Sequence, residues 1–179
     1  RIKIGPPAGP FATAHTISNI CTDSERGLLG LTPDPGFSGN GFVYVYYTRT
    51  SAGAPGGCVN RVSRFTLAGQ QVVAGSEVVL IDNISSNAGN HNGGDVDIAS
   101  DGFLYVSVGD AGRDPRNDSG SAGGNDAGQD LSLLNGKILR LTLTGQPAPG
   151  NPVSGPNTVA CGSRGNTPAT PSTWCQEIF

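Results

Sequence analysis

Apolar and β-branched residues fall into short runs along this chain, separated by segments rich in glycine, proline and asparagine. Such runs predict β-strands, because alternate side chains of a strand point to opposite faces of a sheet. Residues 28–32 are mostly apolar, which predicts a buried strand, whereas residues 62–67 alternate between one buried and one wet face. The first four predicted strands are residues 28–32, 42–48, 62–67 and 77–82.

The strand pattern recurs further along the chain. Gly-Phe-x-Tyr-Val at residues 41–45 returns at 102–106, and Arg-x-Thr-Leu-x-Gly at 64–69 returns at 140–145. The spacing of the second copy requires an extra loop of about 15 residues between its second and third strands. In-phase repetition favours a β-propeller over a β-sandwich, because a sandwich gives no reason for it.

We therefore predict an all-β fold with two successive four-stranded antiparallel blades and long loops. The predicted divisions are the end of a preceding blade and a linker at 1–23, a blade at 24–84, a blade at 85–145 with a long Asp/Gly-rich loop at 110–135, and a Pro/Ser/Thr-rich loop into the next blade at 146–179. Two blades alone leave open edge strands, and the chain contains no methionine. We expect it to be an internal piece of a longer protein.

Composition removes several classes of function. Only 14% of residues are charged and the formal net charge is -3, so the clustered basic face of a nucleic-acid-binding protein is not expected. No apolar stretch is long enough for a membrane span. The 28 glycines and 13 prolines accompany strong strand runs, a combination typical of an all-β protein with ordered loops rather than of a disordered chain.

The chain has four cysteines, without Cys-x-x-Cys spacing and with only two histidines as imidazole partners. A zinc site is therefore not expected. Two disulfides fit the even count, and the simplest pairing is Cys21 with Cys58 and Cys161 with Cys175, although three connectivities are open. Oxidised cysteines would indicate an exported protein, periplasmic or extracellular. Four reduced structural thiols are the alternative.

Residues 90–110 contain the strongest candidate chemistry. If the strands on either side of the Asp101-Gly102 turn form a hairpin, His91 and Asp110 emerge at the same end. The aspartate could then bind one ring nitrogen and leave the other free to accept a proton, as a general base requires. A loop histidine bonded only to backbone is the alternative.

Glu25 precedes the first predicted strand and is expected at the same side of the blades as His91. Its carboxylate could accept hydrogen bonds from substrate hydroxyls. A surface salt bridge with the neighbouring Arg26 is the alternative, and such a pair would contribute little stability.

The loop after Asp110 is polar and acidic. Arg113 is placed to reach a sugar hydroxyl or an anionic cofactor, and pairing with Asp114 is the alternative. Carboxylates among glycines suit calcium, which takes oxygen ligands, but their spacing matches neither an EF-hand nor a Gly-Gly-x-Gly-x-Asp repeat, so a solvated acidic loop is the default interpretation. The carboxylates are Asp114, Asp118, Asp126 and Asp130.

Five patterns, taken in order along the chain, resemble the soluble glucose/sorbosone dehydrogenase family, the pyrroloquinoline-quinone (PQQ)-dependent aldose sugar dehydrogenases. The patterns lie at residues 25–31, 41–48, 91–95, 104–110 and 134–140. The resemblance implies a six-bladed propeller, of which this chain would contain about two to three blades. It also implies an aldose substrate, PQQ and calcium as cofactors, and an electron acceptor.

The resemblance assigns a role to three residues. The histidine at the position of His91 is the base that takes the hydroxyl proton at the anomeric carbon as hydride passes to the quinone, and the aspartate at the position of Asp110 orients it. The residue at the position of Glu25 contacts the sugar and is glutamine in the glucose enzymes, so the preferred sugar stays open.

In that family the quinone and calcium contacts come mostly from later blades, and an Arg-Asn-Pro motif is expected just after Phe179. We therefore expect this segment to contain part of a site and to be inactive by itself. The same propeller also resembles hedgehog-interacting proteins, so the alternative is a noncatalytic propeller that binds a protein or carbohydrate partner through its rim loops.

Overall fold

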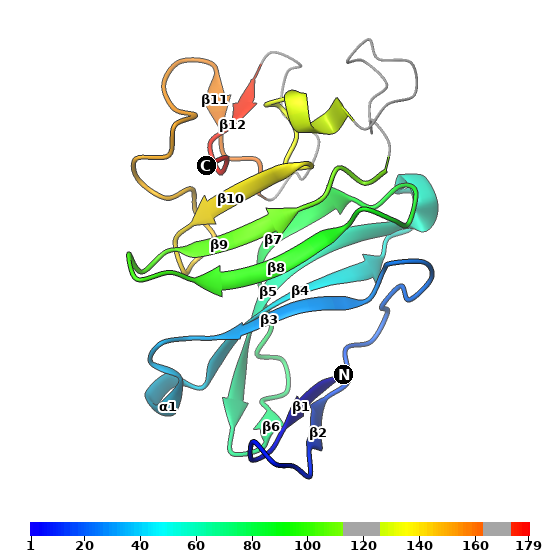
Figure 1. Cartoon of the computed structure of the whole chain (residues 1–179), viewed down its shortest axis with the longest axis vertical. Coiled ribbons are helices and arrows are strands. Elements are labelled where there is room, and N and C mark those ends of the chain that lie inside the picture. The colour runs from blue at the N-terminus through cyan, green and yellow to red at the C-terminus, as the bar shows by residue number, and fades with distance from the viewer. Residues whose placement is uncertain (113–125, 163–172) are drawn as a thin grey trace.

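The structure is a computed structural model that describes residues 1–112, 126–162 and 173–179 of the 179-residue chain. The described residues are almost entirely β-structure and loops (Figure 1). None of the helices among them has the length and apolar character needed to cross a bilayer. The elements are β1 (Ile2–Ile4), β2 (Ala12–His15), β3 (Leu28–Pro33), α1 (Phe37–Asn40), β4 (Phe42–Thr50), η1 (Pro55–Gly57), β5 (Cys58–Ala68), β6 (Gln71–Val72), β7 (Val78–Ser85), β8 (Gly93–Ile98), β9 (Leu104–Val108), η2 (Asp126–Gln129), β10 (Lys137–Leu141), β11 (Thr158–Val159) and β12 (Trp174–Cys175).

The first large sheet consists of β3, β4, β5 and β7 in that order, all antiparallel, with β6 pairing the far end of β5. The four predicted strands are all present. β4 and β5 extend further than predicted, because the ladder continues through polar residues as far as the Thr50–Cys58 pair. The buried Thr48 hydroxyl donates to Asn60 Oδ1 at 2.7 Å there, which satisfies two polar groups inside the sheet.

Residues 28–32 form the predicted strand, but the prediction that this strand is buried is wrong. β3 is an edge strand of its sheet, and Leu31 is 42% exposed. It approaches the second sheet at glycines, since a Cβ on Gly30 would lie 1.9 Å from the carbonyl oxygen of Gly94 in β8. Apolar composition predicted the strand but could not show on which side of it the next layer would lie.

The second sheet contains β8, β9 and β10, again antiparallel, with β9 in the middle. In place of the predicted fourth strand, the described residues contain two isolated bridges to β10, which pair Leu139 with Ile178 and Leu141 with Pro147. β9 ends at Val108 and β10 begins at Lys137, so the segment predicted to hold the extra loop separates these two strands.

The larger hydrophobic cluster joins the two sheets, which overlap around β7, β8 and β9 in the view of Figure 1. It combines Tyr44, Tyr46 and Ile81 of the first sheet with Leu104 and Val106 of the second. A smaller cluster lies on the opposite face of the first sheet, against residues 1–20. Within that segment β1 and β2 pair as a hairpin.

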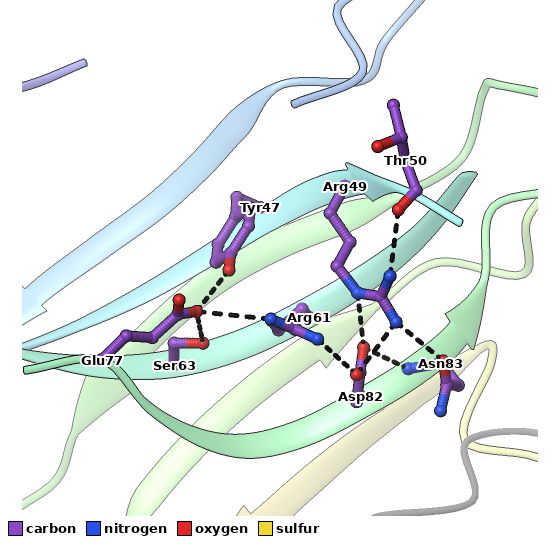
Figure 2. Close-up of polar contacts among 8 residues, drawn as sticks. All are labelled: Tyr47, Arg49, Thr50, Arg61, Ser63, Glu77, Asp82 and Asn83. Atoms are coloured by element: carbon purple, nitrogen blue, oxygen red, sulfur yellow. Dashed lines mark hydrogen bonds and ion pairs between the residues drawn. The ribbon is translucent and has the colours of Figure 1, made fainter. Parts of the chain in front are cut away.

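A polar network covers part of the first sheet, beside a cavity of about 260 Å³. Figure 2 shows Asp82 between the guanidinium groups of Arg49 and Arg61, while Glu77 accepts hydrogen bonds from Tyr47 and Ser63. Burial raises the pKa of Asp82, but the hydrogen bonds from the two arginines outweigh this effect and the pKa is lowered. The network links β4, β5 and β7.

All four cysteines are paired, and the pairing is the simplest one predicted. Cys21 joins Cys58, which ties the segment before β3 to the start of β5. Cys161 joins Cys175 of β12. The alternative of reduced structural thiols is therefore wrong.

A buried glutamate lies close to the second disulfide. Glu177 is 0% exposed, its Oε1 accepts the N–H of Gly162 at 2.7 Å, and its Oε2 has no hydrogen-bond partner among the described residues. Burial raises the pKa of this carboxyl group above its ordinary value, against the opposing effect of backbone hydrogen bonds.

The stability of the protein is expected to depend on pH through Glu177. Because folding favours the protonated form, the contribution is fully present below the ordinary glutamate pKa of about 4.3 and is lost as pH rises through the raised folded-state pKa. We expect Glu177→Gln, which removes the charge and keeps Oε1, to unfold at a higher temperature than the wild type near neutral pH. Thermal unfolding of the complete protein at several pH values checks this, and a variant that is less stable by the same amount at every pH would contradict it.

Candidate active site

His91 lies in the loop between β7 and β8, with a backbone φ of 54°, in the left-handed region that non-glycine residues rarely adopt. Two contacts hold the backbone there. The His91 N–H donates to Glu25 Oε2 at 2.7 Å, and the His91 carbonyl oxygen accepts the N–H of Ala111 at 3.1 Å. These hydrogen bonds, to Glu25 on one side and from Ala111 on the other, offset the strain of the left-handed backbone at His91.

Asp110 follows β9 and meets the His91 side chain at the same end of the β8–β9 hairpin. His91 Nδ1 and Asp110 Oδ1 are 2.9 Å apart, and Oδ1 also accepts the N–H of Gly112 at 3.0 Å. A carboxylate can only accept, so this contact places the proton on Nδ1 and leaves Nε2 unprotonated in the neutral ring. The His91 side chain is 45% exposed and that of Asp110 is 22% exposed, so the imidazole is open to a substrate.

Two glycines allow the loops to approach this closely. A Cβ on Gly109 would lie 1.8 Å from the His91 carbonyl oxygen, and one on Gly93 would lie 2.6 Å from the Gly109 nitrogen. Gly93 also has a φ of 69°. Any larger residue at these positions would push the His91 loop away from the Asp110 loop.

Asn92 anchors the His91 loop from below and is only 2% exposed. Its Nδ2 donates to the carbonyl oxygen of Gly89 at 3.0 Å. Its Oδ1 accepts from Ser86 at 2.6 Å and from Asn60 at 3.1 Å, and its backbone carbonyl accepts the Tyr46 hydroxyl at 2.9 Å. Sequence reasoning missed this role, since nothing in Asn-His-Asn tells which asparagine is buried.

In the structure Glu25 contacts His91. The alternative, a salt bridge between Glu25 and Arg26, is not formed, because Arg26 binds other partners. Arg26 donates to Asp23 at 2.7 Å and to the Ser86 hydroxyl at 3.0 Å. Glu25 remains exposed and spans to the His91 amide. The sequence predicted that Glu25 and His91 lie on the same side of the blades. It did not predict the hydrogen bond from the His91 N–H to the Glu25 carboxylate.

Arg113 and Asp114 lie outside the described residues, as does the Asp118 part of the acidic loop. At the other end of that loop, Asp130 Oδ1 accepts the N–H of Ser132 at 2.8 Å. Within residues 1–112, 126–162 and 173–179, each close group of metal-ligating residue types contains a disulfide-bonded pair of cysteines. These groups cannot bind a metal through thiolates.

A family model described as glucose/sorbosone dehydrogenase matches residues 2–178, nearly the whole chain. The chain belongs to the glucose/sorbosone dehydrogenase family. The resemblance carried by the five sequence patterns is thereby confirmed, and the all-β fold is part of a β-propeller, as predicted.

Two solved structures and one curated protein illustrate the similarity. The crystal structure of an oxidoreductase (glucose dehydrogenase) from Thermus thermophilus is 34% identical with a TM-score of 0.72, over 100% of this chain and 44% of that one. The PQQ-bound aldose sugar dehydrogenase from Streptomyces coelicolor is 31% identical with a TM-score of 0.64, over 82% and 39%. Hedgehog-interacting protein from Mus musculus is 32% identical over 122 residues, 61% of this chain and 17% of that protein. This member of the glucose/sorbosone dehydrogenase family thus spans less than half the length of each.

Proposed function

We propose that the complete protein is a PQQ-dependent aldose dehydrogenase that oxidises the anomeric carbon of a sugar to a lactone. The observation that carries the proposal is the exposed His91 ring bonded through Nδ1 to Asp110. Membership of the glucose/sorbosone dehydrogenase family and similarity to a PQQ-bound aldose sugar dehydrogenase support it.

In this proposal His91 is the general base. Its Nε2 accepts the proton of the C1 hydroxyl group, the C1–H hydrogen leaves with its electron pair, and the C1–O bond becomes a carbonyl. Asp110 keeps the proton on Nδ1 and stabilises the imidazolium that forms. When bound, PQQ would supply the hydride acceptor.

The groups around His91 fit the sugar half of this reaction. They are an imidazole and two carboxylates, Asp110 and Glu25, which accept protons or hydroxyl hydrogen bonds. The neighbouring guanidinium of Arg26 already donates hydrogen bonds to Asp23 and Ser86, so we do not propose it as a ligand of the PQQ carboxylates. Residues that bind the quinone and calcium are therefore proposed to lie elsewhere in the complete protein.

Glu25 and Arg113 are proposed as substrate contacts. For Glu25 the support is an exposed carboxylate bonded to the amide of the base itself. For Arg113 it is the sequence position, three residues after Asp110. Residues 24–84 and 85–145 are proposed as two successive blades, and the two disulfides support export to an oxidising compartment.

The proposal is tested by adding PQQ and calcium to the complete protein and measuring reduction of an artificial electron acceptor with a panel of aldoses. We expect saturable quinone binding and aldose-dependent reduction. Quinone binding without reduction of the acceptor for any aldose would contradict the proposal.

A noncatalytic propeller is the second candidate, supported by the 32% identity with Hedgehog-interacting protein. Such a protein would bind a protein or carbohydrate partner through its rim loops. Failure of the complete protein to bind PQQ in the same titration would favour this second function.

A further inference from the structure

His91 and Asp110 belong to different loops, and their contact depends on how these loops are held together. The His91 loop leaves the first sheet at Ser85, the last residue of β7. The Asp110 loop leaves the second sheet after Val108, the last residue of β9. A residue that binds both loop stems would set the separation of the two side chains.

Asn135 binds both stems. It is 0% exposed and lies just before β10, at the far end of the long loop. Its Nδ2 donates to the Ser85 carbonyl oxygen at 3.1 Å and to the Gly109 carbonyl oxygen at 3.0 Å. The N–H of Gly136 also donates to Gly109, at 3.0 Å.

The chemistry of the contact fixes the orientation of the amide. Both partners are carbonyl oxygens, which only accept, so the group that faces them must be the NH₂ of Asn135. The Asn135 Oδ1, on the other side, has no hydrogen-bond partner among the described residues. A flipped amide would place three oxygens together, whereas the observed orientation uses both N–H groups.

Asn135 is itself held by Lys137, whose side chain is buried. The Lys137 Nζ donates to the Asn135 carbonyl oxygen at 2.9 Å and to the Ala127 carbonyl oxygen at 2.7 Å. The asparagine backbone therefore cannot shift without breaking a buried contact to η2.

We propose that Asn135 is a positioning residue that keeps His91 and Asp110 within hydrogen-bond distance by tying their loop stems together. The inference rests on the proposed function for its consequence in catalysis, because a misplacement of about 1 Å can lower a rate by about 10²-fold. Its geometric part concerns the His91–Asp110 contact alone and needs no cofactor.

The test compares Asn135→Ala with Asn151→Ala in the complete protein. Asn151 is a matched control, since it is also buried and its Nδ2 also donates to two carbonyl oxygens, those of Arg140 at 2.9 Å and Gln176 at 2.8 Å. NMR of ¹⁵N-histidine-labelled protein follows the Nδ1–H of His91, assigned by its absence in His91→Gln. We expect this resonance to be lost in Asn135→Ala and kept in Asn151→Ala.

In the PQQ-loaded protein, kcat with an aldose should fall about 10-fold to 10²-fold in Asn135→Ala with KM nearly unchanged, and stay within about twofold in Asn151→Ala. An unchanged His91 resonance in Asn135→Ala would overturn the proposal. If that variant does not fold, Asn135→Asp keeps the side-chain shape without the two donors and is expected to lose the resonance too. A wild type that shows the resonance but oxidises no aldose would refute the proposed function and leave the positioning role standing.

Discussion

Replacing His91 by glutamine is expected to lower kcat for aldose oxidation by about 10²-fold to 10⁴-fold, the range that a general base contributes. Glutamine has a similar length but its amide does not accept a proton at neutral pH. Affinity for PQQ should change little, because the residues proposed to bind it lie elsewhere. Steady-state reduction of an electron acceptor by the PQQ-loaded complete protein measures the rate, and a quinone titration measures the affinity.

The chain supplies a matched control for this variant. His15, the only other histidine, lies in β2 with its ring 5.5 Å from that of Phe65, beneath the first sheet. His15→Gln should leave kcat within about twofold of the wild type. Equal rates in His91→Gln and the wild type would show that His91 is not the general base of the reaction.

Two substitutions of Asp110 are expected to differ in size. Asp110→Ala removes the acceptor of the Nδ1 proton, so the ring loses both its orientation and its charge partner, and kcat should fall by about 10²-fold to 10³-fold. Asp110→Asn can keep an oxygen at the Oδ1 position, where the N–H of Gly112 donates at 3.0 Å, but it carries no charge. Its kcat should fall less than that of Asp110→Ala, because the retained oxygen can still accept the Nδ1 proton.

The same acceptor assay measures both variants. The order of the two rates is the informative result, because it separates orientation of the ring from charge stabilisation of the imidazolium. An alanine variant that is as active as the asparagine variant would show that Asp110 does not orient His91.

The hairpin that carries the site was predictable because its signal is local. Alternating residues, a turn at Asp101-Gly102 and a polar residue beyond each end are enough to place His91 beside Asp110, and their 2.9 Å contact is what the structure contains. The internal repeat predicts an insertion between the strands that the structure contains as β9 and β10. The disulfide pairing was the simplest of three and proved correct.

Contacts between distant segments were not predictable. Asn92 and Asn135 are polar residues next to glycines, a setting typical of exposed turns, yet both are buried and each binds two or more backbone or side-chain groups. The exposure of Leu31 depends on which face of β3 meets the second sheet. The backbone contact of Glu25 to His91 depends on the path of a loop 66 residues away.

The measurement that tests the central claim most directly is a single turnover of the PQQ-loaded complete protein with an aldose, without an external electron acceptor. Absorbance of the quinone is followed in the wild type with ordinary and C1-deuterated sugar, and in His91→Gln. We expect a change in absorbance that is slower with the deuterated sugar and slower by about 10²-fold or more in His91→Gln. A wild type and a His91→Gln variant that react at the same rate would contradict it.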